Sequence, residues 1–403
     1  MTKTSKRYII VFVEIIFLLL LTLAIFFFDL DIKLQKFSYQ PNSSSSVWYQ
    51  KENPFWQFGY HYGPLPAFLL TFAALVGFIL SWIKPKIKNY RRYFLLIILT
   101  LIISPGMLVN TIFKDYWGRP RPRQVQEFGG RWEFKQVWQP GTPGKGKSFP
   151  CGHCSMGFFF IVLYYSFKQK HKILACASLV FSLTFGTFIG FARISQGGHF
   201  LSDVLWSCGL TYITATILYY FILKIPDKYE KAQKMRTVKI HQKISKIKLI
   251  FVIIAMVLAT AIMILIFLFS KPFYKEYFHN INSDDRFKII QLDFQLERGN
   301  ISIFSGKYDH PIHIQTIIQG YGFPTYIFNS KLLNEIENDT LKATYLLNFK
   351  GIFDEIDVAT SVYIDTSQVV HLSGTTHDGS IFFVENSSTK LKTSFETLDE
   401  QHN

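Results

Sequence analysis

Long apolar runs alternate with short polar loops over the first two thirds of the chain. The runs lie near residues 8–28, 65–83, 93–113, 154–167, 173–190, 203–223 and 249–269. Most reach the roughly 20 residues that a helix needs to cross the hydrocarbon core of a bilayer. The first run is long for a cleaved signal peptide, the alternative for this segment, and no small-residue cleavage site follows it. The pattern predicts a mainly α membrane protein with seven crossings, the seventh at 249–269.

Positive charge is concentrated in alternate loops between these runs. Residues 1–270 hold 32 Lys/Arg against 10 Asp/Glu, whereas residues 271–403 hold 11 against 18. The basic segments are the N-terminus (Lys3, Lys6, Arg7), 84–92, 168–172 and 224–248. The positive-inside rule places these segments, and hence the N-terminus, in the cytoplasm and the C-terminus outside. The charge is therefore interpreted as a topology signal, not a nucleic-acid surface, although the loop at 224–248 also suits anionic lipid headgroups.

An aromatic segment lies in the outer loop at 29–64. Its rings are Trp48, Tyr49, Phe55, Trp56, Phe58, Tyr60 and Tyr62. Such side chains favour the membrane–water interface. The segment is either an ordinary aromatic belt or a cap that guides a lipid into a site.

From about residue 271 the chain changes to short stretches of alternating apolar and polar residues. They read IIQLDFQL, GNISIFSG, HIQTIIQG, KATYLLNF, SVYIDTSQVVHLSG and GSIFFVE, with Gly, Asn, Asp and Ser between them. This pattern predicts an all-β extramembrane domain. GNISIFSG and DGSIFFVE resemble one another and are similar to bacterial adhesin-type β-solenoid modules. A protein or envelope component is the expected partner of this domain. The predicted domains are a helical membrane core at 1–223, a basic loop at 224–248, a seventh span at 249–269 and a β domain at 270–403.

The stretch Cys151-Gly152-His153-Cys154 allows two interpretations. A redox CxxC motif needs a βαβ unit with a strand leading into it, but a Gly/Pro/Lys-rich loop precedes this one. The alternative is Pro150-x-Gly152-His153 opening an apolar helix, in a turn whose backbone N–H groups suit an anion. On an oxidising outer face the two cysteines are candidates for a disulfide.

Three polar motifs fall at the ends of different runs and on one predicted face. They are Lys114-x6-Arg121-Pro122, Pro150-Cys151-Gly152-His153 and Arg193-x5-His199-x3-Asp203. Fixed Lys and Arg donors match the equatorial oxygens of a transferring phosphoryl group. A carboxylate four residues from a histidine can hold the imidazole tautomer, leaving its other nitrogen to attack phosphorus. No further cluster of acidic, Cys or His residues suggests a metal, so neither metal nor cofactor is expected.

These motifs, in this order, closely resemble the signature of the type 2 phosphatidic acid phosphatase superfamily, over roughly residues 60–225. The resemblance implies a six-helix membrane core and metal-independent hydrolysis through a phosphohistidine. It implies His199 as nucleophile, Asp203 as its orienting partner and His153 as general acid, with Lys114, Arg121 and Arg193 as phosphate ligands. The family usually has Ser where this chain has Cys151, and a thiol is a weak donor. This departure puts a Cys151–phosphate contact in question and leaves the Gly152 amide as a candidate contact.

A local likeness bears on the substrate. Glu127-Phe128-Gly129-Gly130 resembles the corresponding stretch of bacterial lipid A 1-phosphatases. It predicts a phosphatase acting on a membrane lipid of the lipid A type, with the site and the C-terminal domain on the periplasmic face of a bacterial inner membrane. The alternatives are an undecaprenyl-diphosphate or phosphatidylglycerol-phosphate phosphatase, a lipid phosphotransferase, and an inactive membrane scaffold for the β domain.

Overall fold

The computed structural model describes residues 2–40, 48, 53–130, 132–143 and 146–234, the four positions 247, 250, 251 and 254, and most of 272–394. Contacts divide the chain into two units. The first comprises Met1–Arg123 and Glu133–Ile264, and the second Gln124–Trp132 and Leu265–Asn403. The predicted seventh span at 249–269 lies almost wholly outside the described residues.

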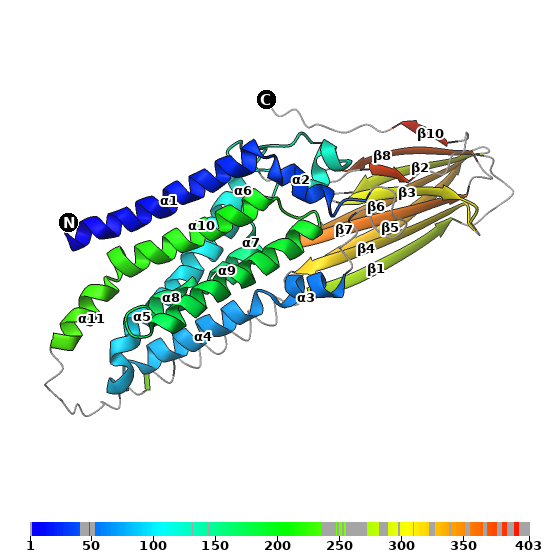
Figure 1. Ribbon diagram of the computed structural model, residues 1–403. Coiled ribbons are helices and arrows are strands. Elements are labelled where there is room, and N and C mark those ends of the chain that lie inside the picture. Colours follow the sequence, from blue (N-terminus) through cyan, green and yellow to red (C-terminus); the bar gives the residue numbers. More distant parts are fainter. Residues whose placement is uncertain are drawn as a thin grey trace. The chain divides into compact units, whose positions relative to one another are not determined.

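The first unit is a bundle of helices (Figure 1). In chain order they are α1 (Lys3–Phe27), α2 (Leu30–Lys36), α3 (Pro54–Tyr62), α4 (Leu65–Leu80), η1 (Pro85–Tyr90), α5 (Arg91–Leu101), η2 (Ile102–Phe113), α6 (Lys114–Tyr116), η3 (Pro122–Gln124), α7 (Gly152–Phe158), α8 (Ile161–Phe167), α9 (Lys172–Ser195), α10 (Leu201–Ile217), η5 (Leu218–Ile222) and α11 (Ile225–Lys234). A short turn, η4 (Gln126–Phe128), belongs to the second unit.

Several of these helices are long and apolar enough to cross a membrane. Among the described residues they are Thr4–Phe27, Pro54–Leu80, Pro85–Tyr116, Lys172–Ser195 and Leu201–Ile222, and Gly152–Phe167 is a shorter apolar helix. These six segments coincide with the first six predicted runs. One difference is that the aromatic residues at 54–62 form helix α3, which leads into α4, whereas the sequence pattern placed them in a loop. The protein is a multi-pass membrane protein.

The described parts of the four basic segments meet at one end of the bundle. Arg7 forms an ion pair with Asp227 at 2.5 Å, and Arg92 donates to the carbonyl of Leu223. Lys170 Nζ donates to the hydroxyl of Tyr90 at 3.0 Å. The charge pattern thus correctly groups these segments on one side of the bundle.

The segment η2 widens from α-helical to π-helical geometry around an internal proline. Pro105 lacks the N–H that would continue the helical hydrogen bonds. The carbonyl of Pro105 accepts a hydrogen bond from Asn110 Nδ2 at 2.7 Å. Thr111 Oγ1 donates to the carbonyl of Gly106 at 3.0 Å. The segment ends directly at Lys114, so its unusual winding sets the direction in which the first motif leaves the bundle.

The second unit contains two five-stranded sheets (Figure 1). One has the order β1-β4-β7-β3-β9 and the other β10-β8-β2-β6-β5. The strands are β1 (Pro272–Ile281), β2 (Ile289–Leu296), β3 (Asn300–Gly306), β4 (Ile312–Tyr321), β5 (Ile327–Glu337), β6 (Thr340–Lys350), β7 (Glu355–Asp365), β8 (Val369–Thr376), β9 (Ile381–Val384) and β10 (Leu391–Ser394).

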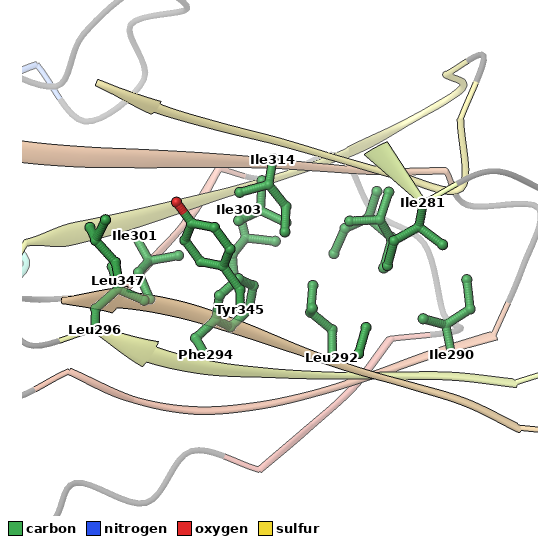
Figure 2. Close-up of a cluster of buried hydrophobic side chains, with 14 of the residues drawn as sticks. Ile281, Ile290, Leu292, Phe294, Leu296, Ile301, Ile303, Ile314, Tyr345 and Leu347 are labelled. Carbon is green, nitrogen blue, oxygen red and sulfur yellow. The ribbon is translucent and has the colours of Figure 1, made fainter. Parts of the chain in front are cut away.

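Alternating apolar residues build the core of this unit. On β2, Ile290, Leu292, Phe294 and Leu296 are buried while the residues between them face outward. Figure 2 shows these side chains meeting residues of the other sheet, among them Ile301 and Ile303 of β3 and Ile314 of β4. Removing these apolar side chains from water is the main contribution to the stability of this unit.

The two similar phrases in the tail pair with each other. β3 and β9 are parallel neighbours, with Ile301 opposite Ile381 and Ile303 opposite Phe383. This register is the one obtained when Gly299 of GNISIFSG is aligned with Gly379 of DGSIFFVE. The internal similarity therefore corresponds to stacked, equivalent strands.

Candidate active site

His199 is buried between α9 and α10, and its two ring nitrogens have different environments. Nδ1 lies 2.5 Å from the backbone carbonyl of Ser148. A carbonyl can only accept, so Nδ1 carries the proton and the neutral ring keeps its lone pair on Nε2. Nε2 is buried with no hydrogen-bond partner among the described residues. The ring is therefore fixed in the tautomer that presents a nucleophilic nitrogen.

Asp203, in the first turn of α10, supports this arrangement indirectly. One carboxylate oxygen, Oδ2, accepts from Ser148 Oγ at 2.6 Å and from the Phe200 amide at 2.8 Å. The same oxygen is 3.8 Å from His199 Nδ1, beyond hydrogen-bond distance. Asp203 thus holds Ser148, whose carbonyl holds the imidazole, whereas the sequence pattern predicted a direct Asp203–His199 contact.

Arg119 joins this group to the N-terminal region of the chain. Its Nη1 donates to Asp203 Oδ1 at 2.6 Å and to Ser202 Oγ at 2.7 Å. Its Nη2 donates to Asp31 Oδ2 at 2.9 Å. Arg119 and Asp203 are fully buried and Asp31 is nearly so. The guanidinium is neutralised by two carboxylates, whose attraction outweighs the effect of burial and raises its pKa.

The turn before His199 requires glycine. Gly197 has φ of +62°, and a Cβ there would lie 2.4 Å from the ring of Trp48. Its carbonyl accepts from the amide of Arg123 at 3.2 Å, which joins the first motif to the third. Arg121 is buried and lies between Arg119 and Arg123 in the chain. Because Arg119 binds Asp203 and the Arg123 amide binds Gly197, Arg121 lies beside the His199 turn.

Arg193 and His153 both contact the ring of Tyr60. The Arg193 guanidinium carbon is 4.4 Å from the centre of the Tyr60 ring. The His153 ring stacks on Tyr60 with centres 4.9 Å apart. Arg193 also donates to Gln196 Oε1 at 2.6 Å, and a Cβ on Gly198 would lie 2.9 Å from its Nη2. Helix α3 therefore supplies a wall of the site and brings the second and third motifs together.

Lys114 and Gly152 share a neighbour on η2. Lys114 Nζ lies 3.5 Å from Asn110 Oδ1, and a Cβ on Gly152 would lie 2.3 Å from the same oxygen. The absence of a side chain at Gly152 allows this approach. Asn110 consequently links the first motif to the start of α7.

Cys151 is buried next to His199. Its amide donates to the carbonyl of Asp203 at 3.3 Å. Burial raises the pKa of the Cys151 thiol, but hydrogen bonding from Cys154 and the charge of His199 outweigh it and set the pKa below its usual range. Cys151 and Cys154 are both free thiols. The structure thus shows no disulfide between them, and Cys154 Sγ instead donates to the carbonyl of Cys151 at 3.3 Å.

The predicted site residues therefore gather at one end of the bundle, linked by the contacts above. The sequence pattern did not identify Asp31, Ser148, Asn110 or Arg119, and it named Tyr60 only as one ring of the aromatic segment. The sequence did offer one signal for Asp31, its negative charge, because acidic residues are rare in the first 270 positions. Within the described residues, no three or more His, Cys, Asp or Glu side chains form a group that could hold a metal ion.

Comparison with known proteins identifies the domain that holds this site. Residues 93–227 match the model of the PAP2 superfamily. The chain contains a PAP2 superfamily domain. The match includes all three motifs and confirms the resemblance, while α1 to α4 and the β unit lie outside it.

The PAP2 domain has curated relatives. The chain is 41% identical over 143 residues to the lipid A 4′-phosphatase of Francisella tularensis subsp. novicida (strain U112), covering 34% of this chain and 60% of that protein. It is 30% identical over 150 residues to the lipid A 4′-phosphatase of Rhizobium leguminosarum, covering 37% and 57%. The chain thus spans between half and three fifths of the length of the relatives it matches.

Two solved structures are also similar. A transmembrane PAP2 type phosphatidylglycerolphosphate phosphatase from Bacillus subtilis aligns with a TM-score of 0.33 and 19% identity, over 57% of this chain and 98% of that one. A cell adhesion protein from Clostridium sporogenes aligns with a TM-score of 0.25 and 10% identity, over 31% of this chain and 58% of that one.

Proposed function

We propose that this protein is a metal-independent membrane lipid phosphatase that removes a phosphate from lipid A through a phosphohistidine on His199. The observation that carries the proposal is the state of His199. Its Nδ1–H is bound to the Ser148 carbonyl, and its buried Nε2 has no hydrogen-bond partner among the described residues. A lone pair held in this way, next to cationic side chains, is suited to in-line attack on a phosphate ester.

The reaction proceeds in two steps. In the first, Nε2 forms a bond to phosphorus, the bond from phosphorus to the sugar oxygen breaks, and His153 gives its proton to that oxygen. In the second, His153 takes a proton from water, whose oxygen attacks phosphorus, and the P–N bond breaks to release phosphate. Together, the two steps return the enzyme to its starting protonation state.

Cationic side chains supply the charge stabilisation. Lys114, Arg121 and Arg193 are buried within the three linked segments of the site. Fixed cations in a site with little water stabilise the charge that develops on the phosphoryl oxygens. Because these donors can neutralise the phosphoryl group by themselves, we expect turnover in the presence of EDTA.

The relatives support the 4′-position of lipid A in preference to the 1-position. Both curated relatives described above are lipid A 4′-phosphatases. The short likeness at residues 127–130 is a narrower basis than 143 aligned residues at 41% identity. We therefore propose 4′-dephosphorylation, in place of the 1-phosphatase activity that the sequence motif predicted.

The topology completes the proposal. The basic segments share one end of the bundle, and the positive-inside rule assigns that end to the cytoplasm. The active site would then open on the periplasmic face of an inner membrane, where a seventh span at 249–269 would also deliver the β domain.

The test is phosphate release by the purified protein in detergent with EDTA. The lipids are lipid A, undecaprenyl diphosphate and phosphatidylglycerol phosphate, and mass spectrometry locates the phosphate that lipid A loses. We expect release from lipid A at the 4′-position. Loss of the 1-phosphate would overturn the positional assignment, and a requirement for added metal would overturn the metal-free mechanism.

The pH dependence of the rate follows from the site. Burial lowers the pKa of His199, but the Cys151 sulfur and the Asp203 carboxylate outweigh burial, so the pKa is raised above its usual value. The nucleophile must be neutral, and kcat/KM should therefore rise with pH through a midpoint above about 6.5. In Cys151→Ser, which removes the sulfur, this midpoint should move to lower pH.

The measurement is kcat/KM against pH for the wild type and both cysteine variants. Cys176→Ser is the matched control, because Cys176 is exposed. If the midpoint of the rise in kcat/KM is the same in Cys151→Ser as in the wild type, the sulfur does not influence the pKa of His199.

A further inference from the structure

We propose that helix α2, which lies outside the PAP2 domain, acts as a clamp on the catalytic turn through two positioning residues, Asp31 and Gln35. The inference rests on the proposed phosphatase activity and deepens it. Neither residue belongs to the three motifs, and both lie more than 50 positions before the matched range of 93–227. The catalytic turn of the PAP2 domain is thus completed by a segment from the N-terminal part of the chain.

Asp31 holds the start of α10. Its Oδ1 accepts from the amide of Ser202 at 2.8 Å, and its Oδ2 accepts from the Ser202 hydroxyl at 2.6 Å. Oδ2 also accepts from Arg119 at 2.9 Å. One carboxylate therefore fixes both the backbone beside Asp203 and the guanidinium that binds Asp203.

Gln35 holds the backbone of the nucleophile itself. It is four residues after Asp31, so the two side chains lie on one face of α2. Its Nε2 donates to the carbonyl of His199 at 2.6 Å, and the side chain is fully buried. His199 is thus held from two directions, its ring by Ser148 and its carbonyl by Gln35.

The clamp has features that go beyond packing. Gln35 Oε1 is buried and has no hydrogen-bond partner within the part of the chain that the structure describes. A buried amide with one unpaired atom is unfavourable compared with an apolar side chain of the same size. Asp31 and Asp203 share the single positive charge of Arg119, so these three groups together carry one negative charge, and Asp203 Oδ2 lies 3.8 Å from His199 Nδ1. That charge suits an imidazole that becomes positive when Nε2 bonds to phosphorus.

The clamp acts on geometry and charge at the nucleophile, not on substrate binding. The residues that would contact the lipid phosphate lie on α6, α7 and α9 and in the segment that follows α6. We therefore expect loss of the clamp to lower kcat and to leave KM nearly unchanged, because a small displacement of a nucleophile has a large effect on rate.

The experiment compares Asp31→Asn and Gln35→Leu with wild type in steady-state kinetics on lipid A. The matched controls are Asp29→Asn and Lys36→Leu, two exposed positions beside or within α2. We expect a 10- to 100-fold fall in kcat in each clamp variant, with KM within about twofold of wild type. The controls should retain the wild-type kcat. Thermal unfolding of each purified variant establishes that it is folded, and Gln35→Leu, which removes one donor, decides the matter if Asp31→Asn does not fold.

The outcomes separate the clamp from the activity on which it rests. An active wild type with folded clamp variants of unchanged kcat would overturn the clamp and leave the phosphatase in place. A rise in KM with unchanged kcat would also overturn it, because the residues would then act in substrate binding. A wild type that releases phosphate from no lipid would overturn the proposed function and the clamp together.

Discussion

Replacing His199 with alanine is expected to lower kcat by roughly four to six powers of ten, because the reaction loses its nucleophile. The buried imidazole presents Nε2 to the site while the Ser148 carbonyl fixes Nδ1. Asp203 cannot take its place, because its carboxylate is already bound by Ser148, Phe200 and Arg119. Phosphate release from lipid A by the purified variant measures the loss.

The matched control is His171→Ala. His171 is exposed before α9 and makes no side-chain cap. Its variant should release phosphate at the wild-type rate. A His199→Ala protein that is folded and keeps more than about a hundredth of the wild-type rate would remove His199 from the mechanism.

Replacing Arg119 with leucine is expected to destabilise the protein by about 3–5 kcal/mol, the typical effect of removing one partner from a buried ion pair. Arg119 is fully buried and binds both Asp31 and Asp203. Without it, two carboxylates remain buried and close together with no counter-ion. Loss of folded protein on heating or on titration with denaturing detergent measures the change.

Arg119→Lys provides the comparison. An ammonium keeps the charge but cannot donate in the planar fork that reaches Asp203, Ser202 and Asp31 together. Its stability should fall between those of the wild type and Arg119→Leu. Equal stability of all three proteins would contradict the assignment of this residue as the centre of a buried network.

The local pattern of the sequence predicted the elements well where one face is buried. Six apolar runs correspond to described helices because each must cover about the same thickness of hydrocarbon. The stretch at 289–296 alternates because one side of β2 faces the core. By contrast, β5 was not predicted. Among the described residues it is an edge strand with β6 as its one neighbour, so most of its side chains are exposed and the alternation is lost.

The site was predicted as a set of motifs but not as a network. Spacing within a motif identified His199, Asp203 and the cationic residues, since those residues are neighbours in the chain. The contacts of Asp31 with Arg119 and Ser202 join positions 88 and 171 residues apart. Helix packing in three dimensions decides such pairs, and one sequence contains no local signal for them. The contact of Ser148 with His199 was missed for the same reason, because it uses a backbone carbonyl.

The central claim is most directly tested by trapping the phosphoenzyme. Purified protein is mixed with lipid A radiolabelled in its phosphates, quenched in alkali to preserve phosphohistidine, and digested to locate the label. We predict label on the peptide that contains His199 and none in His199→Ala. Phosphate release without any labelled His199 peptide, or label on the neighbouring Cys151 instead, would contradict the account.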